Sequence, residues 1–291
     1  MIRRPPRSTQ SRSSAASDVY KRQRQLLRMR LTESGMRAEQ AELLRAAMAS
    51  PAGGIILMSG PRHSGRTVSM YAALREIDLF SRNVLAVEQQ VSIDIPDVTQ
   101  RSVDKASGQT LAGAVQDALR TDPDVVMVET VADGETARML LTGAAAGKLM
   151  IGGLVAGDAA EAVEGFVRLA GDRQSVGATI RAATCQRLVR TLCPACREAY
   201  RPNPDFLRKA NLQSSQVDVL YREPKSRPVD KKGQVLVCPM CRNEGYVGHT
   251  VFYEVLLFDE EARRQLAAGG TMAEVLSLIH ISEPTRLLSI S

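Results

Sequence analysis

A glycine-punctuated loop between an apolar run and a helix-forming segment constrains the fold of this chain more than any other feature. The run Ile55–Met58 is typical of a buried strand, and residues 67–77 have helical composition. Gly60 and Gly65 bound the loop and allow the tight turns that direct successive backbone N–H groups toward an anion. A helix that begins directly after the loop adds the partial positive charge of its N-terminus. The order of strand, loop and helix predicts a phosphate-binding loop, with a purely structural turn as the alternative.

The loop departs from the usual phosphate-loop pattern G-x-x-x-x-G-K-[ST] at the lysine. Arg66 stands at that position, whereas Thr67 supplies the hydroxyl that holds Mg²⁺ in such loops. Because the arginine fork is larger than an ammonium group, we expect ATP and Mg²⁺ to bind here weakly. His63 is interpreted as a loop residue that tolerates a positive φ, with nucleotide contact as the alternative. The predicted nucleotide-binding residues are Gly60, Pro61, Arg62, His63, Ser64, Gly65, Arg66 and Thr67.

Both ends of the chain resemble translated sequencing adapters. Residues Asp18–Gln23 and Leu276–Ile281 correspond to one DNA tag translated in its two orientations. We therefore attribute residues 1–23 and 276–291 to cloning or assembly and expect no contribution from them to the native fold. A disordered basic tail is the alternative. The natural protein is accordingly expected to extend beyond the remaining segment at both ends.

Charge and hydropathy narrow the classes of function. The chain carries 38 basic and 32 acidic residues, for a net charge of +6. Without the adapter-like ends, 31 basic and 30 acidic residues remain, and the net charge falls to +1. This near balance removes the electrostatic argument for nucleic acid as a partner. No apolar run approaches the roughly 18 residues of a membrane span, so any membrane association is expected to be peripheral.

Short apolar runs alternate with helical segments along most of the chain. Strands are predicted at 83–88, 124–129 and 149–154, with two β-compatible pieces around Pro96 within 91–101. Helices are predicted at 67–77, 110–121, 133–146, 158–170 and 175–192, after an earlier one that ends near Met48. This alternation is typical of an α/β fold with a mainly parallel sheet covered on both faces. Cys185 is expected on a helical face, where it contributes to packing.

The other four cysteines form two closely spaced pairs. Cys193 and Cys196 flank Pro-Ala, and Cys238 and Cys241 flank Pro-Met after a gap of 41 residues. Each pair supplies two thiolates from one tight turn, and two such turns complete a tetrahedral four-sulfur site. We predict a structural Zn²⁺ ion there, with an unmetallated knuckle or a redox pair as alternatives. His249 is interpreted as a strand-edge residue and not as a ligand.

Three further motifs, taken with the phosphate loop, resemble one family. They are DPDVVMV at 122–128, QRLVRTLCPAC at 186–196 and CPMCRNEGYVGHTVFYE at 238–254. Their order and spacing are similar to those of the secretion ATPases that drive type II secretion and type IV pilus assembly, over roughly residues 31–275. The resemblance implies a RecA-like P-loop NTPase domain with a mainly parallel sheet, plus a small tetracysteine subdomain of the zinc type.

The resemblance also implies an organisation and a cellular setting. The ATPase domain is expected at 24–192, the tetracysteine insert at 193–248, and a C-terminal strand and helix of the ATPase region at 249–275. A separate N-terminal domain normally precedes this part in the family. Its members form hexamers, here homo- or hetero-hexamers with related ATPase subunits. They act on an inner-membrane assembly platform protein, from the cytoplasm and peripherally at that membrane.

Positions that carry the family's chemistry depart from its pattern. Thr130 stands where the family has the glutamate that orients the attacking water, and Glu129 lies one residue earlier. A shift of one residue along a strand is expected to point Glu129 to the other face. Glu88 is the one acid kept from the family's acidic box. Val155 stands where the family has a histidine.

Loss of a base, a metal-positioning acid and a polar sensor together favours a degenerate ATPase, because phosphoryl transfer relies on positioning and charge stabilisation. We therefore prefer a non-hydrolysing structural or regulatory subunit. The alternative is an active motor with rearranged catalytic groups, for which Glu129 and Glu88 are the catalytic candidates. A free-standing zinc-dependent interaction module accounts for the cysteines but not for the predicted sheet.

Overall fold

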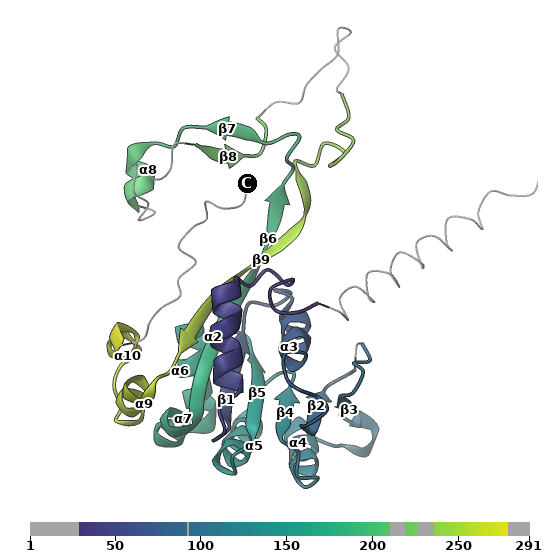
Figure 1. Cartoon of the computed structure of the whole chain (residues 1–291), viewed down its shortest axis with the longest axis vertical. Coiled ribbons are helices and arrows are strands. Elements are labelled where there is room, and N and C mark those ends of the chain that lie inside the picture. The colour runs from purple at the N-terminus through teal and green to yellow at the C-terminus, as the bar shows by residue number, and fades with distance from the viewer. Residues whose placement is uncertain (1–28, 92, 210–218, 226–235, 279–291) are drawn as a thin grey trace, which may run out of the picture. The chain divides into compact units, whose positions relative to one another are not determined.

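The computed structural model describes residues 29–91, 93–209, 219–225 and 236–278 (Figure 1). They form two compact units: the described residues up to Arg187, together with those from Tyr253 on, make the first, and the described part of Leu188–Phe252 makes the second. Residues 1–23 and 279–291 of the adapter-like ends lie outside the described residues. Within the described ranges, every helix is too short or too polar to traverse a bilayer.

A seven-stranded sheet is the centre of the first unit, and two of its strands, 180–192 and 246–257, continue into residues of the second. Its order is β3-β2-β4-β5-β1-β6-β9, and neighbours from β3 to β6 pair in parallel. The strands are β1 (Gly54–Ser59), β2 (Val84–Glu88), β3 (Thr99–Ser102), β4 (Val125–Val128), β5 (Leu149–Leu154), β6 (Ile180–Leu192) and β9 (Tyr246–Leu257). The predicted α/β fold with a mainly parallel sheet is confirmed.

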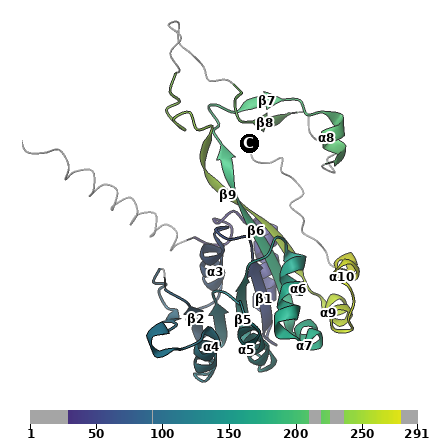
Figure 2. The ribbon, with the colours of Figure 1, turned by 180° about the vertical axis from the view of Figure 1, so that it is seen from behind.

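Helices cover both faces of this sheet, which is why its central strands are continuous apolar runs. Helix α2 lies in front of the sheet in Figure 1, and α6 lies in front of it in the reverse view of Figure 2. The helices are α2 (Ala38–Met48), α3 (Arg66–Leu74), α4 (Leu111–Leu119), α5 (Gly134–Ala145), α6 (Ala159–Ala170), α7 (Arg173–Thr179), α9 (Glu260–Ala267) and α10 (Met272–Leu278). A 3₁₀ turn at Lys105–Ser107 precedes α4.

Polar caps start several of these helices. The Thr110 hydroxyl accepts a hydrogen bond from the Gly113 N–H, as its predicted role of N-cap requires. Asp133 and Asp158 cap α5 and α6 in the same way. The last helix, α10, includes three residues of the adapter-like segment 276–291, and Leu276 packs against the core. The expectation that this segment contributes nothing to the fold is therefore wrong at Leu276.

The predicted helix at 175–192 is wrong beyond its first turn. Helix α7 ends at Thr179, and Ile180–Leu192 forms β6, which pairs in parallel with β1. Residues such as Ala182, Ala183 and Gln186 favour a helix locally, but the free edge of β1 offers backbone partners that override this propensity. Cys185 consequently lies on a strand, where it is buried.

The two β-compatible pieces predicted within 91–101 reduce to one strand. Only β3 forms, and in the described residues before it the side chain of Gln100 supplies the backbone partners that a strand ladder would give. Its amide oxygen accepts from Ile95 N–H at 2.6 Å, and its amide nitrogen donates to the Ile93 carbonyl at 2.9 Å. The backbone groups of Ile93 and Ile95 are therefore paired without a neighbouring strand.

The second unit contains the two cysteine turns and a small antiparallel pair. Strands β7 (Glu198–Tyr200) and β8 (Leu220–Arg222) pair with each other, and α8 (Pro204–Lys209) lies between them in sequence. Arginine–aromatic contacts support this unit: the Arg197 guanidinium lies 4.0 Å from the centre of the Tyr221 ring.

Candidate functional site

The loop after β1 has the backbone of an anion-binding turn. Gly65, the N-cap of α3, has a φ of 82°, and His63 has a φ of 63°. Both values lie in the left-handed region, which glycine adopts freely and histidine more readily than most residues. A turn from Pro61 to Ser64, closed by an N–H to carbonyl bond of 3.2 Å, leads into the helix. The loop therefore delivers the N-terminus of α3 to the end of the sheet, as predicted.

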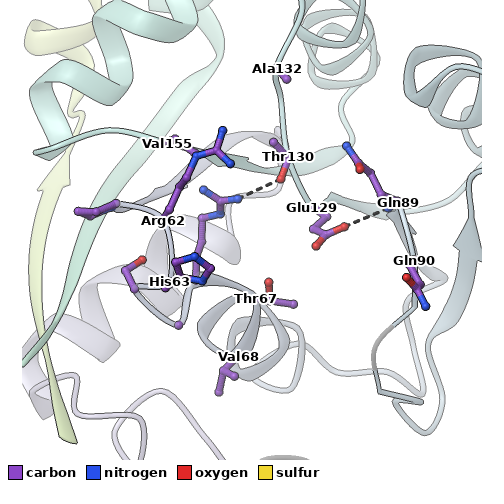
Figure 3. A pocket seen from close by; sticks show the side chains of 14 residues that line it. Arg62, His63, Thr67, Val68, Gln89, Gln90, Glu129, Thr130, Ala132 and Val155 are labelled. Atoms are coloured by element: carbon purple, nitrogen blue, oxygen red, sulfur yellow. Dashed lines mark hydrogen bonds between the residues drawn. The ribbon is translucent and has the colours of Figure 1, made fainter.

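A cavity of about 710 Å³ opens above this loop (Figure 3). Seven of the eight predicted nucleotide-binding residues line it, and Gly60 does not. Its lining comes from the phosphate loop and from the residues that follow β2, β4 and β5, where the carboxyl ends of parallel strands meet. The lining residues are Pro61, Arg62, His63, Ser64, Gly65, Arg66, Thr67, Val68, Gln89, Gln90, Glu129, Thr130, Ala132 and Val155.

Ser64 of the loop and Gln186 of β6 each carry a buried polar side-chain atom without a partner among the described residues. The Ser64 hydroxyl is buried and makes no hydrogen bond within the described residues, although Ser64 lines the cavity. The Gln186 side chain, on β6, donates to the Ser64 carbonyl at 2.8 Å, while its own oxygen lacks a partner. Buried polar groups are normally paired, so an orphaned hydroxyl beside a helix N-terminus fits a site that accepts a polar, anionic ligand.

Arg66 is directed toward the ends of two neighbouring strands. One terminal nitrogen donates to the Leu154 carbonyl at 2.7 Å. The other donates to the Thr130 hydroxyl at 3.0 Å, which is the dashed line at Thr130 in Figure 3. Burial lowers the pKa of Arg66, and the Glu129 carboxylate acts in the opposite direction. A guanidinium nevertheless remains charged in proteins. The residue at the lysine position is thus anchored at the carboxyl ends of β4 and β5.

The expectation that Glu129 faces away from Thr130 is wrong. Both residues line the cavity, because β4 ends at Val128 and the alternation of a strand no longer applies beyond it. The Glu129 carboxylate accepts from the Gln89 N–H at 3.0 Å (Figure 3). Glu129 is therefore the single carboxylate among the residues that line this cavity.

Glu88, the second catalytic candidate, is placed elsewhere. It is fully buried at the end of β2 and is absent from the cavity lining. Its carboxylate accepts hydrogen bonds from the Tyr71 hydroxyl and from the Gln100 amide. Burial raises the pKa of Glu88, although these hydrogen bonds act against the rise. Glu88 ties α3 to β2 and β3 and has no access to a ligand in the cavity.

A nucleotide with Mg²⁺ fits this donor set only in part. The left-handed loop, the α3 N-terminus and the Ser64 hydroxyl suit phosphate oxygens. Mg²⁺ prefers carboxylate oxygens alongside the phosphates, and Glu129 is the one carboxylate of the lining, with one oxygen accepting from the Gln89 N–H. Thr130 stands where the resemblance implies a further glutamate. Thr67 lines the cavity and keeps its hydroxyl. The residues fit a polyphosphate better than they fit the metal.

Gly153 supports the site and was missed by the sequence reasoning. A Cβ atom at this position would lie 2.0 Å from the Glu129 carbonyl oxygen and 3.1 Å from Nε of Arg66. Real Cβ atoms do not approach backbone so closely, and only glycine fits. The signal was available, since glycine inside an apolar strand such as β5 often marks a close approach.

The four paired cysteines meet in the second unit. Their sulfur atoms all lie within 4.8 Å of one another, with 3.9 Å between Cys193 and Cys238 and 3.6 Å between Cys196 and Cys241. A disulfide requires about 2.05 Å, whereas four sulfurs at about 2.3 Å from a tetrahedral Zn²⁺ lie about 3.8 Å apart. The predicted clustering is confirmed, and its spacing matches a zinc site.

Backbone groups favour the thiolate form of Cys238 in this cluster. Backbone N–H groups, that of Cys241 first, lower the pKa of Cys238 to about 6, and the hydrogen bond to Cys238 raises the pKa of Cys196. The second turn is held by the Asn243 side chain, which accepts from the Cys238 N–H at 2.8 Å. His249 lies exposed on β9 and is not part of the cluster.

The fold is that of a class of ATPases with known structures. The chain resembles the pilus retraction motor PilT with bound ADP, at a TM-score of 0.59 and 17% identity over 86% of this chain and 59% of that one. It also resembles the ATPase DotB of Legionella pneumophila, at a TM-score of 0.55 and 20% identity over 86% of this chain and 56% of that one. These likenesses establish the fold.

Sequence comparison identifies the family. Residues 19–289 match the family described as type II/IV secretion system protein, and the chain belongs to this family. The match reaches into both adapter-like segments. The chain is 31% identical to the type IV pilus assembly ATPase PilB of Thermus thermophilus over an alignment of 224 residues. That alignment covers 76% of this chain and 24% of PilB. It is 32% identical over 233 residues to the type II secretion system ATPase E of Vibrio cholerae. This alignment covers 80% of this chain and 44% of that relative. The chain thus spans less than half the length of these two relatives.

Proposed function

We propose that this chain is a nucleotide-binding subunit of a type II secretion or type IV pilus assembly machine that hydrolyses ATP poorly or not at all. The hydrogen bond of 3.0 Å between Arg66 and Thr130 carries this proposal. It joins the two positions at which the family has its phosphate-loop lysine and its catalytic glutamate, so that a fixed guanidinium and a hydroxyl stand where a mobile lysine and a base are expected.

Binding is expected because the phosphate cradle is mostly backbone. The N–H groups of the loop and the N-terminus of α3 do not depend on which side chain follows Gly65. Turnover is expected to fail because Thr130 cannot accept a proton from water at neutral pH. Val155 lines the cavity with an exposed apolar side chain where a polar sensor is required.

The surrounding assembly follows from the family. We propose a homo- or hetero-hexamer with related ATPase subunits that acts on an inner-membrane assembly platform protein, at the cytoplasmic side. We propose two functional parts. The ATPase region comprises 24–192 and 249–275, and the zinc-bearing insert comprises 193–248. The adapter-like segments 1–23 and 276–291 are proposed to have no role in that activity, although Leu276 packs against the core.

An active motor with rearranged groups is the second candidate, and the position of Glu129 favours it. Its carboxylate lines the cavity within reach of the loop, where it could act as a general base. Phosphate release at saturating ATP, measured on the unmodified chain and on Glu129→Gln, separates the two. The preferred proposal expects little or no release from either protein, whereas release at a motor-like rate, on the order of 1 s⁻¹ or faster, that disappears in Glu129→Gln would establish the motor.

A further inference from the structure

Three segments that are far apart in sequence bring Arg66, Thr130 and Leu154 together. Strands β4, β5 and β1 are neighbours in the sheet and run parallel, so their carboxyl ends meet at one edge. Arg66 begins the helix after the loop from β1, Thr130 follows β4, and Leu154 ends β5. The two hydrogen bonds of Arg66, at 2.7 and 3.0 Å, therefore fix one guanidinium across the floor of the cavity.

The sequence provides the space for this guanidinium. Any side chain at position 153 would meet Nε of Arg66 at 3.1 Å and the Glu129 carbonyl oxygen at 2.0 Å. Nε of Arg66 is buried and has no partner among the described residues. Arg66, Thr130 and Gly153 thus form one compatible set. The buried Nε is closed off from a ligand, but the two hydrogen bonds use only one N–H of each terminal nitrogen, so the second N–H of each remains as a donor.

The charges around the cavity are those of an anion site. Arg62 and Arg66 line it with positive charge, and Glu129 is the one opposing carboxylate, already engaged by the Gln89 N–H. Gln89 and Gln90 are neutral. A divalent cation beside the Thr67 hydroxyl would therefore be repelled by the fixed guanidinium of Arg66. Its one carboxylate ligand from the lining would be Glu129, one oxygen of which already accepts from the Gln89 N–H.

We propose that Arg66 takes the place of the divalent cation in this cavity, so that the chain binds nucleotide polyphosphates without Mg²⁺. A planar guanidinium pairs well with phosphate oxygens, and the α3 N-terminus adds its partial charge. The inference rests on the proposed function only in requiring that the cavity binds nucleotide.

The test is a titration of the whole chain with the fluorescent nucleotide mant-ATP, once in excess Mg²⁺ and once in excess EDTA. The dissociation constant is expected to change by less than about threefold between the two conditions. Arg66→Gln is expected to weaken binding in EDTA by about tenfold or more. Arg120→Gln, which removes an exposed arginine at the end of α4, is the matched control and should leave binding unchanged.

A second variant keeps the test decisive if Arg66→Gln does not fold. Arg66→Lys/Thr130→Glu restores a carboxylate and removes the guanidinium, and Mg²⁺ should then tighten binding by about tenfold or more. Binding by the unmodified chain that requires Mg²⁺ would overturn this inference and leave the nucleotide site intact. So would a double variant that remains insensitive to Mg²⁺. Absence of mant-ATP binding in both conditions would instead remove the proposed nucleotide site and this inference with it.

Discussion

The phosphate loop and the tetracysteine cluster are both built from tight turns, yet they depend on side chains to different degrees. In the loop, left-handed backbone at His63 and Gly65 leads into the start of α3 and forms the proposed anion site, while Arg66 replaces the expected lysine. In the cluster, four identical sulfur atoms lie within 4.8 Å of one another. A backbone site keeps its shape when its side chains are exchanged, whereas a four-ligand metal site loses its function with any one ligand.

The largest effect is expected at the cluster. Purified protein should contain about one Zn²⁺ per chain, and Cys193→Ser/Cys238→Ser should contain none, because a four-sulfur site needs all its thiolates. Metal binding of this kind can supply about 10 kcal/mol or more of folding free energy. The second unit should therefore become sensitive to proteolysis, which limited digestion with mass spectrometry would detect.

The fifth cysteine offers the matched control for that experiment. Cys185→Ser changes a buried thiol of the first unit, whereas the cluster belongs to the second, and should leave the zinc content at its original value. Protein that is free of metal and still resists digestion would show that the cluster folds without an ion. The comparison between the two turns would then fail.

The next largest effect is expected at Gly153, whose missing side chain leaves space for Arg66. Gly153→Ala places a Cβ 2.0 Å from a backbone oxygen and should cost about 1–3 kcal/mol through overpacking. This corresponds to a loss of several degrees in the unfolding temperature, about 2–4 °C per kcal/mol for a unit of this size. Gly165→Ala, in the interior of α6 and without a close neighbour, should be neutral or stabilising. Equal stability of both variants would contradict the close packing around Arg66.

A smaller effect is expected from the buried carboxyl group of Glu88. Burial raises the pKa of Glu88, so its contribution to stability is complete below the ordinary carboxyl pKa and is lost as the pH rises through the raised value. Glu88→Gln removes this titration and should flatten the decline of the free energy of unfolding as the pH rises above the ordinary carboxyl pKa. Urea unfolding at several pH values measures it, with the exposed Glu135→Gln as control. Parallel pH profiles for unmodified protein and Glu88→Gln would contradict the assignment.

The smallest effect is expected at the chain ends. Removal of residues 1–23 should leave the unfolding temperature unchanged, because adapter-encoded residues were never selected to pack. Removal of 276–291 takes Leu276 away from the core, so a loss of up to about 1 kcal/mol is expected. A larger loss from the N-terminal cut, measured by thermal melting, would contradict the adapter interpretation.

The sequence predicts those parts of the fold whose signal is local. Strands β2, β4 and β5 were predicted because continuous apolar runs between turns mark buried parallel strands. Strand β6 was not, because its residues have helical composition and its partner β1 lies far away in sequence. The cysteine cluster followed from spacing alone.

The orientation of side chains in the cavity could not be predicted from the sequence. The contact of Arg66 with Thr130 and Leu154 depends on how three strand ends meet. The position of Glu129 depends on β4 ending one residue before it. The sequence therefore located the departures from the family pattern, and the structure shows that the residues at two of these positions, Arg66 and Thr130, form a hydrogen bond with each other.

Phosphate release combined with ATP titration, on the unmodified chain and on Arg66→Lys/Thr130→Glu, tests the central claim most directly. The account predicts that the unmodified chain binds nucleotide and releases no phosphate, and that the double variant gains release because a base is restored and the lysine can reach the phosphates. Release by the unmodified chain at a motor-like rate, on the order of 1 s⁻¹ or faster, would contradict it.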